Sequence, residues 1–273
     1  MPELPEVETV KRDLARTALG LTIQDVRIID PRIIRDIKPA QFKSRLKNQT
    51  IINITRRGKA IIFTFNKGPF LIVQLMMTGQ LVFVKALPDV ILKETKVIFT
   101  LSNGNYLLYN DQRLFGRLSL IDDLNTFKHF QLLGPEPFDA VFDPEFIKKA
   151  FKSKAVAAKK VLLDHTFVAG IGNIYASEIL FRSRIDPRRG AKSLKTEEIK
   201  RLHKEIIDVL QEAIEFRGSS MRNYRDGQGD KGKFNQRIKV YAKEHEPCEI
   251  CQTTITRIVQ GGRSTFYCKK CQR

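Results

Sequence analysis

The stretch CEICQTTITRIVQGGRSTFYCKKC, residues 248–271, decides the fold of the C-terminal end of this chain. It holds all four cysteines of the chain, as two C-x2-C pairs. The residues between the pairs read as two strands joined by a turn at Gly261-Gly262. Two close pairs at the ends of a hairpin supply four thiolates in the tetrahedral arrangement that Zn²⁺ prefers. The predicted zinc ligands are Cys248, Cys251, Cys268 and Cys271.

Disulfide bonds are the alternative for cysteines this close together. A reducing cytosol disfavours disulfides, and the chain has no other cysteine that would indicate a disulfide framework. Four protein ligands leave no open coordination position, so we expect the metal to be structural. Arg263 lies at the tip of the predicted hairpin, either as one more solvated cation or as a phosphate contact, and the charge of the chain favours phosphate.

The chain carries 48 lysines and arginines against 30 aspartates and glutamates in 273 residues, a formal net charge of +18. This excess favours a polyanionic partner, because phosphates attract Lys and Arg and release counterions on binding. A basic surface that only keeps the protein soluble is the alternative. No apolar run reaches the ~18–20 residues that a membrane span needs, and the N-terminus lacks the apolar segment of a signal peptide. We expect a cytoplasmic protein, associated with the nucleoid if it binds DNA.

Residues 1–133 are predicted to form a β-sandwich or barrel-like domain that begins with a helix over 5–18. Pro5 suits the start of this helix, glutamates occupy its first turn, and Gly20 ends it. β-branched and aromatic runs follow, and Asn103-Gly104 predicts a hairpin between two of them. The expected strands are 22–29, 50–57, 60–65, 70–76, 95–101 and 105–110.

Residues 143–273 are predicted to form a second, helical domain after a Pro- and Gly-containing linker at 134–142, which makes the fold class α+β with two domains. A helix from Asp143 to about 152 and a longer one from Thr196, with an apolar core stripe, frame a helix pair over about 155–184. The stretch 217–237 has four glycines and no apolar period, so it is a functional loop or a disordered one. The zinc finger takes up about 239–273.

The first ten residues, MPELPEVETV, have two interpretations. Pro and Glu are common at helix starts, so the segment can simply cap a helix, and taken alone this reading is favoured. The other depends on removal of Met1, which the small side chain of Pro2 permits. The Pro2 nitrogen is then a secondary amine that titrates nearer neutrality than lysine and can attack an electrophilic carbon. Glu3 adjoins it as a proton donor or acceptor, and Glu6 lies within one turn.

Four unrelated motifs, in the same order along the whole chain, together resemble the formamidopyrimidine-DNA glycosylase family. They are MPELPEVETV at the start, RRGK at 56–59, LLDHTFVAGIGNIYASEILF at 162–181 and GGRSTFYCKKCQR at 261–273. The third motif is similar to the family's helix–two-turn–helix, and the fourth is similar to its zinc-finger end. The resemblance implies an N-terminal β-sandwich domain and a C-terminal DNA-binding domain that ends in the zinc finger.

The resemblance also implies a bifunctional enzyme. Such enzymes remove oxidised purines, chiefly 8-oxoguanine and formamidopyrimidines, from duplex DNA and then cleave the backbone at the abasic site. Pro2 would attack C1′ of the damaged nucleotide and form a Schiff base, while Glu3 handles protons with support from Glu6. Lys59 would assist β-elimination and Arg263 δ-elimination, leaving a gap with phosphate at both ends. The zinc ion is the only cofactor that the resemblance implies, and it takes no part in this chemistry.

A base inside the stack must be turned outward before an enzyme can reach it. The positions that match the family's inserted residues are Met77, Arg113 and Phe115. A thioether and an aromatic ring can insert between bases, and a guanidinium can hydrogen-bond the cytosine that has lost its partner. The positions that match phosphate contacts are Lys154, Lys159 and Asn173. The loop expected to close over the extruded base comprises Ser219, Ser220, Met221, Arg222, Asn223 and Tyr224.

Three positions depart from the family pattern. Gln74 stands where histidine is common. Glu94 stands near a position where a DNA-contacting histidine often occurs, and because a carboxylate repels phosphate, that contact is not carried over. Arg217 precedes Gly218 where a second glycine is usual, which bears on the mobility of the loop.

Two other functions share parts of this pattern. A non-catalytic zinc-finger protein that binds DNA would have the charge, the finger and the helix pair, but would not need a free Pro2 amine or Glu3. An enzyme of the endonuclease VIII type would use similar chemistry on oxidised pyrimidines. The expected partner is double-stranded DNA with oxidised bases or abasic sites, and nothing in the sequence indicates a dimer, so a monomer is expected.

Overall fold

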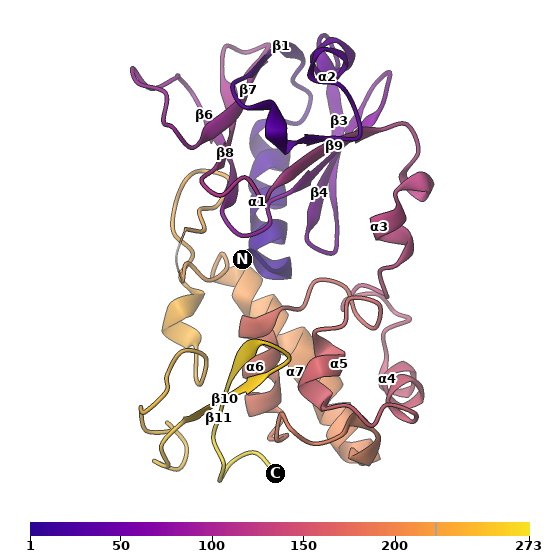
Figure 1. Cartoon of the computed structure of the whole chain (residues 1–273), viewed down its shortest axis with the longest axis vertical. Coiled ribbons are helices and arrows are strands. Elements are labelled where there is room, and N and C mark those ends of the chain that lie inside the picture. The colour runs from indigo at the N-terminus through magenta and orange to yellow at the C-terminus, as the bar shows by residue number, and fades with distance from the viewer. Residues whose placement is uncertain (222) are drawn as a thin grey trace. The chain divides into compact units, whose positions relative to one another are not determined.

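The computed structural model describes residues 1–221 and 223–273, and its contacts divide the chain into two compact units (Figure 1). The first unit comprises Met1–Gln131 and Phe216–Asn235. The second comprises Leu132–Glu215 and Gln236–Arg273. The loop expected at 217–237 therefore lies almost wholly in the first unit, although the chain reaches it from a helix of the second.

Two sheets form the first unit, as the sandwich prediction requires. A four-stranded antiparallel sheet has the order β1-β7-β8-β6, and a five-stranded sheet has the order β2-β9-β5-β4-β3. The strands of the first sheet are β1 (Ile23–Ile28), β6 (Gly79–Val84), β7 (Thr95–Leu101) and β8 (Tyr106–Asp111). Those of the second are β2 (Ile34–Arg35), β3 (Ile51–Arg57), β4 (Ala60–Phe65), β5 (Phe70–Gln74) and β9 (Arg117–Ile121).

The core of this unit lies between the sheets because alternate side chains of each strand point inward. Phe63 of β4 and Phe99 of β7 belong to one buried cluster, together with Val7, Val10 and Leu14 of helix α1 (Leu4–Thr17). Helix α1 contacts β3 and β4 of one sheet and β6 of the other, so its first turn is held by the core of the sandwich. The predicted helix at 5–18 is thus confirmed within one residue at each end.

Local signals predicted most of these elements. The hairpin at Asn103-Gly104 is confirmed: Gly104 has a φ of +80°, a left-handed conformation that glycine adopts without strain. The elements of this unit that were missed are helices α2 (Pro39–Leu46) and α3 (Lys128–Gln131) and strands β2, β6 and β9. Pro39 at the start of α2 and the buried pair Phe42 and Leu46, four residues apart, were a usable signal for that helix.

Helices are the main regular elements of the second unit. They are α4 (Pro144–Phe151), α5 (Ala158–Leu162), α6 (Asn173–Arg182) and α7 (Thr196–Glu215), with the hairpin β10 (Thr256–Gln260) and β11 (Arg263–Tyr267). The predicted stripe of α7 is buried, which confirms that it is core: Ile199, Leu202, Ile206, Leu210 and Ile214. Helix α5 is shorter than expected. In the described part of the chain, no helix combines the length and apolarity that crossing a bilayer requires.

Candidate active site

The N-terminus begins on the cap of α1. Met1 is 47% exposed, whereas Pro2 and Glu3 are buried. Glu3 is the N-cap residue, and it forms a reciprocal capping box with Glu6 in the first turn. The Glu3 backbone N–H donates to Glu6 Oε2 at 2.7 Å. The capping interpretation of this segment is therefore correct, and it leaves the chain terminus beside a pair of buried carboxyl groups.

The second oxygen of Glu6 reaches a distant segment. Glu6 Oε1 accepts a hydrogen bond from the backbone N–H of Ser219 at 2.7 Å, and Glu6 is only 1% exposed. A Cβ on Gly218 would lie 2.8 Å from Glu6 Cγ, so the backbone approaches this carboxylate as closely as only glycine permits. One buried carboxylate thus connects the N-terminus to the loop that sequence reasoning assigned to the damaged base.

Lys59 lies in the two-residue turn between β3 and β4 and is half-buried. Arg56, in the last part of β3, donates to the Gly58 carbonyl at 3.0 Å and to Glu8 Oε2 of helix α1 at 3.0 Å. Because Arg56 is bonded to both, the turn that carries Lys59 is tied to the second turn of α1. The structure thus attaches the turn with Lys59 to the helix whose N-cap is Glu3.

Met77, Arg113 and Phe115 form an exposed cluster on two neighbouring loops of the first unit. The Arg113 guanidinium carbon lies 4.5 Å from the centre of the Phe115 ring, and Arg113 Nη1 lies 3.6 Å from Met77 Sδ. Met77 is 39% exposed and Phe115 is 45% exposed. Large apolar side chains left open to solvent beside a cation are suited to contact with stacked bases.

Asp111 holds the two loops of this cluster together. Its carboxylate is fully buried and accepts hydrogen bonds from the Gly116 N–H at 2.7 Å, the Arg113 N–H at 3.1 Å and the Thr78 hydroxyl. Thr78 follows Met77 directly, so one carboxylate sets the backbone on both sides of the cluster. Charge-assisted hydrogen bonds of this kind are roughly twice as strong as neutral ones.

The loop segment 219–224 is described except for Arg222, which lies outside the described residues. Tyr224 is 7% exposed and its hydroxyl donates to the Glu6 carbonyl at 3.3 Å, so this side chain belongs to the core of the first unit. Met221 is exposed. The Ser220 hydroxyl donates to the Tyr224 carbonyl at 3.0 Å, which closes the turn between them.

A polar cavity of about 250 Å³ opens beside this loop in the first unit. Its lining includes Thr78, Gln80, Asn110, Asn223 and Arg225. Glu94, one of the three departures, also lines it, and its carbonyl accepts from the Asp111 N–H at 2.7 Å. The cavity offers amide donors and acceptors but little apolar surface, so it is suited to the polar edge of a planar heterocycle. Gln74, another departure, ends β5 and pairs with Ala60 and Arg117.

In the second unit, Lys159 and Asn173 meet at one carbonyl of the zinc-finger hairpin. Lys159 is 1% exposed, and its ammonium donates to the Ser264 carbonyl at 3.1 Å and to the Thr265 hydroxyl at 2.8 Å. The Asn173 amide donates to the same carbonyl at 2.9 Å. Arg263 precedes Ser264 and is exposed. Both side chains therefore fix the hairpin next to Arg263.

Lys154 differs from Lys159 in its exposure. Its side chain is 34% exposed, and its ammonium lies 3.3 Å from Asp164 Oδ2. An ion pair that is partly exposed is weak and easily exchanged for another anion. Of the two lysines expected to contact phosphate, Lys154 is the accessible one in this structure.

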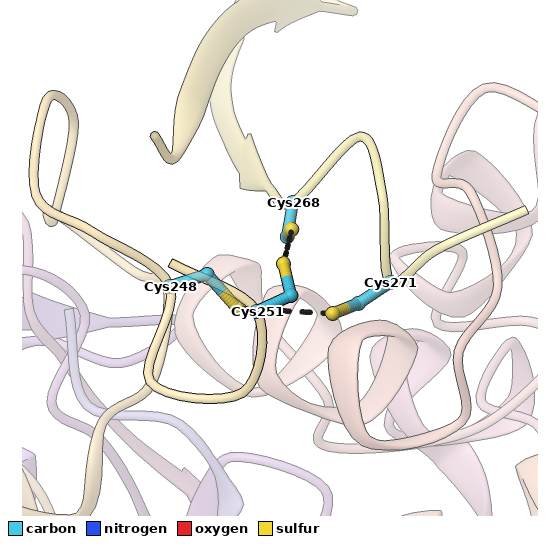
Figure 2. A group of neighbouring side chains, drawn as sticks. All are labelled: Cys248, Cys251, Cys268 and Cys271. Atoms are coloured by element: carbon cyan, nitrogen blue, oxygen red, sulfur yellow. Dashed lines mark hydrogen bonds between the residues drawn. The ribbon is translucent and has the colours of Figure 1, made fainter. Parts of the chain in front are cut away.

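The four cysteines converge at one point (Figure 2). Their sulfur atoms all lie within 4.8 Å of one another, with Cys248 and Cys271 at 3.8 Å and Cys251 and Cys268 at 3.4 Å. Tetrahedral zinc with Zn–S bonds of about 2.3 Å places its sulfurs about 3.8 Å apart. The four thiols, two buried and two half-buried, fit one structural zinc ion.

Comparisons with known proteins cover nearly the entire chain. Residues 1–118 match the formamidopyrimidine-DNA glycosylase N-terminal domain, and residues 133–225 match the H2TH domain of the same enzymes. Residues 246–273 match a zinc finger found in Fpg and IleRS. The chain belongs to the formamidopyrimidine-DNA glycosylase family. This finding confirms the resemblance, the α+β fold with its zinc finger, and the predicted zinc.

Curated relatives and solved structures of this family cover the chain from end to end. The formamidopyrimidine-DNA glycosylase of Pelotomaculum thermopropionicum is 43% identical over 100% of this chain and 99% of its own length. The complex of Lactococcus lactis Fpg with DNA that contains an abasic site has a TM-score of 0.92, with 35% identity over 99% of both chains. The Thermus thermophilus MutM (Fpg) protein has a TM-score of 0.87 at 37% identity, over 99% of this chain and 98% of its own.

The sequence did not reveal Asp111 as a functional residue of this glycosylase, and it indicated only a supporting role for Glu6. Asp111 lies two residues before Arg113, and an acidic residue at the end of a strand in a chain of charge +18 was a usable signal. Asp111 connects the two loops because its buried carboxylate also accepts a hydrogen bond from Thr78, which is 33 residues away along the chain.

Proposed function

We propose that this chain excises oxidised purines from duplex DNA and cleaves the backbone at the resulting abasic site, with the Pro2 nitrogen as nucleophile. The family assignment gives the glycosylase, and an AP lyase step is typical of the family. The observation that supports the assignment to Pro2 is the capping box: Glu6 holds the Glu3 N–H at 2.7 Å, so the terminus has a fixed direction beside a buried carboxyl group. A terminal amine held in place loses little freedom when it attacks.

The proposed chemistry begins after removal of Met1. The Pro2 amine attacks C1′ of the damaged nucleotide, the glycosidic bond breaks and the base departs with its electron pair. The nitrogen loses its proton and the sugar ring opens, which gives a Schiff base. Glu3 is the proposed proton carrier because it adjoins the amine. Lys59 assists β-elimination and Arg263 assists δ-elimination.

The zinc ion takes no part in these steps. Its four cysteine ligands leave no position for substrate, and its proposed contribution is to hold the hairpin that carries Arg263.

Exposure of the base is the step for which the Met77, Arg113 and Phe115 cluster is proposed. Met77 and Phe115 wedge into the stack, and Arg113 hydrogen-bonds the cytosine left behind. The extruded base is proposed to lie against residues 219–224, beside the polar cavity. A Lactococcus lactis Fpg variant has been solved with DNA that contains Fapy-dG, which supports an oxidised purine as the substrate class.

Contacts of the second unit with phosphate are part of the same proposal. Lys154 and Arg263 are proposed to bind phosphate directly, while Lys159 and Asn173 act through the Ser264 carbonyl that they hold. The proposed partner is double-stranded DNA bound by a monomer. A cytoplasmic location at the nucleoid is part of the proposal, because the proposed substrate is DNA.

Borohydride trapping tests this function. The protein is incubated with duplexes that contain 8-oxoguanine opposite cytosine or, separately, thymine glycol, and the imine is reduced. We expect a covalent adduct that forms faster with 8-oxoguanine and maps to Pro2. Pro2→Gly, which replaces the secondary amine with a less constrained primary one, should lose at least about 100-fold in excision rate, within the range that covalent and acid–base catalysis supply.

Pro39→Gly, which alters an exposed proline at the start of α2, is the matched control and should trap normally. Faster trapping with thymine glycol would favour the endonuclease VIII type. Binding of DNA without any adduct would favour a non-catalytic zinc-finger protein. A Pro2→Gly variant that excises as fast as the wild type would remove Pro2 as nucleophile.

A further inference from the structure

The loop that follows α7 starts with two residues in the left-handed region. Arg217 has a φ of +61° and Gly218 a φ of +77°. Glycine adopts this conformation freely, but a residue with a Cβ is strained in it. Arginine at 217 therefore needs a compensating interaction, and the structure contains one.

Arg217 makes an ion triad with two buried aspartates of the same unit. Its Nη2 lies 2.6 Å from Asp13 Oδ2 and 2.6 Å from Asp226 Oδ2, and its Nε lies 2.9 Å from the latter. The Asp13 side chain is 1% exposed and that of Asp226 is 0% exposed, whereas that of Arg217 is 32% exposed. One cation thus compensates two buried carboxylates, and without it both lose their charge partner.

The triad connects both ends of the segment 217–227 to helix α1. Asp13 belongs to α1, and its Oδ2 also accepts from the Gly227 N–H at 3.1 Å. Asp226 Oδ1 accepts from the N–H groups of Gln228 and Asp230, which fixes the turn beyond. A Cβ on Gly227 would lie 2.6 Å from Asp13 Cβ, so the loop backbone is seated directly on the helix.

Asp13 and Glu6 are two helical turns apart, so they lie on the same side of α1. Glu6 holds the Ser219 N–H and the Glu3 N–H, while Asp13 holds Arg217 and Gly227. The first residues of the loop are therefore attached to α1 at two points, one of them the carboxylate that also caps the catalytic end of the helix.

We propose that Arg217 is a positioning residue. It fixes the start of the loop that contains residues 219–224 on α1, through Asp13 and Asp226, and so keeps the Ser219 N–H hydrogen-bonded to Glu6. This inference rests on the proposed function, in which residues 219–224 receive the extruded base. A loop that is ordered before DNA binds loses less conformational entropy when the base arrives. On the proposed function, the loop takes part in excision of a damaged base, whereas a site that already lacks a base has nothing for the loop to receive.

Arg217→Gly is the primary test, because glycine suits the left-handed backbone while the whole side chain, with its guanidinium, is removed. We expect excision of 8-oxoguanine to fall by about 5- to 30-fold, as a loss of 1–2 kcal/mol implies, with cleavage of a preformed abasic site within about 2-fold of wild type. Hydrogen exchange at the Ser219 and Gly227 amides should become faster in the DNA-free protein. Arg217→Lys keeps the charge without the planar fork and should restore part of both readouts.

Arg27→Gln removes one exposed cation from β1 of the same unit and should change neither reaction. Equal losses in excision and abasic-site cleavage would overturn the proposal, because a general structural role affects both. Unchanged exchange at Ser219 and Gly227 would also overturn it. If the wild type excised no 8-oxoguanine, the proposed function would fail. Hydrogen exchange at the Ser219 and Gly227 amides would still decide whether the triad orders the loop.

Discussion

Glu6 and Ser219, 213 residues apart in sequence, share a buried hydrogen bond of 2.7 Å between a carboxylate oxygen and a backbone N–H. The other oxygen of the same carboxylate accepts from the Glu3 N–H at the same distance. A group that needs two acceptor oxygens at once must be a carboxylate, because an amide supplies only one. Glu6 therefore couples the capped terminus of α1 to the loop at 219–224.

The first prediction concerns this coupling. In Glu6→Gln the amide nitrogen must face one of the two N–H groups, which leaves a buried donor opposite a donor. Hydrogen bonds to charged groups contribute about 1.5–3 kcal/mol, so excision of 8-oxoguanine should fall by about 10- to 100-fold in single-turnover assays. Glu145→Gln changes an exposed first-turn glutamate of α4 and should behave as wild type. Equal activity of the two variants would contradict a coupling role for Glu6.

The second prediction concerns the buried Asp111 carboxylate, which holds the two loops of the Met77, Arg113 and Phe115 cluster. Asp111→Asn keeps the shape of the side chain but cannot accept from Gly116, Arg113 and Thr78 together. We expect the free energy of unfolding to drop by about 1–3 kcal/mol, measured by urea denaturation. Opening of the duplex, followed by the fluorescence of 2-aminopurine beside the lesion, should slow.

Asp122→Asn is the control for this experiment, because that side chain is 76% exposed. Normal base opening in Asp111→Asn would show that the two loops keep their arrangement without the carboxylate.

The third prediction is a pH dependence of stability. Burial opposes ionisation of Glu8, but hydrogen bonds from Lys11, Arg12 and Arg56 outweigh it and hold the pKa of Glu8 below its usual 4.5. Between the lowered folded pKa and the unfolded pKa, the unfolded chain binds more protons, so Glu8 stabilises the fold above about pH 4.5 and this contribution is lost as the pH falls through the folded pKa.

Urea unfolding at a series of pH values from about 7 to about 3 tests this expectation. Wild type should lose stability on acidification more steeply than Glu8→Gln, which lacks the titrating group. If the free energy of unfolding fell in parallel with pH for the two proteins, Glu8 would not contribute to the loss of stability in acid.

The fourth prediction concerns the metal. The native protein should contain about one zinc ion per chain, and Cys268→Ala should lose it, because three thiolates bind zinc less tightly than four. Since β11 ends one residue before Cys268, the hairpin with Arg263 should loosen and DNA affinity should fall. Val259→Ala, at an exposed hairpin position that is not a ligand, is the control. Undiminished DNA affinity after complete zinc loss would show that the finger is dispensable for binding.

Local features were determined by the sequence itself. The C-x2-C pairs, the Asn103-Gly104 turn and the Pro- and Glu-rich helix start depend on conformational preferences and ligand chemistry within a few residues. Motif order along the whole chain was enough to assign the family. Strands β6 and β9 were missed because each lies among residues with turn and loop character.

Only the tertiary structure decided which distant residues meet. Glu6 with Ser219, Arg217 with Asp13, and Asp111 with Thr78 are pairs that no sequence spacing predicts, because each depends on how separate segments pack. Lys159 shows the same limit: in the sequence it is one cation among 48, and only burial against the zinc-finger hairpin makes it a support for Arg263. A charged side chain is buried where the fold provides its partners, and those partners are chosen by packing over the whole chain.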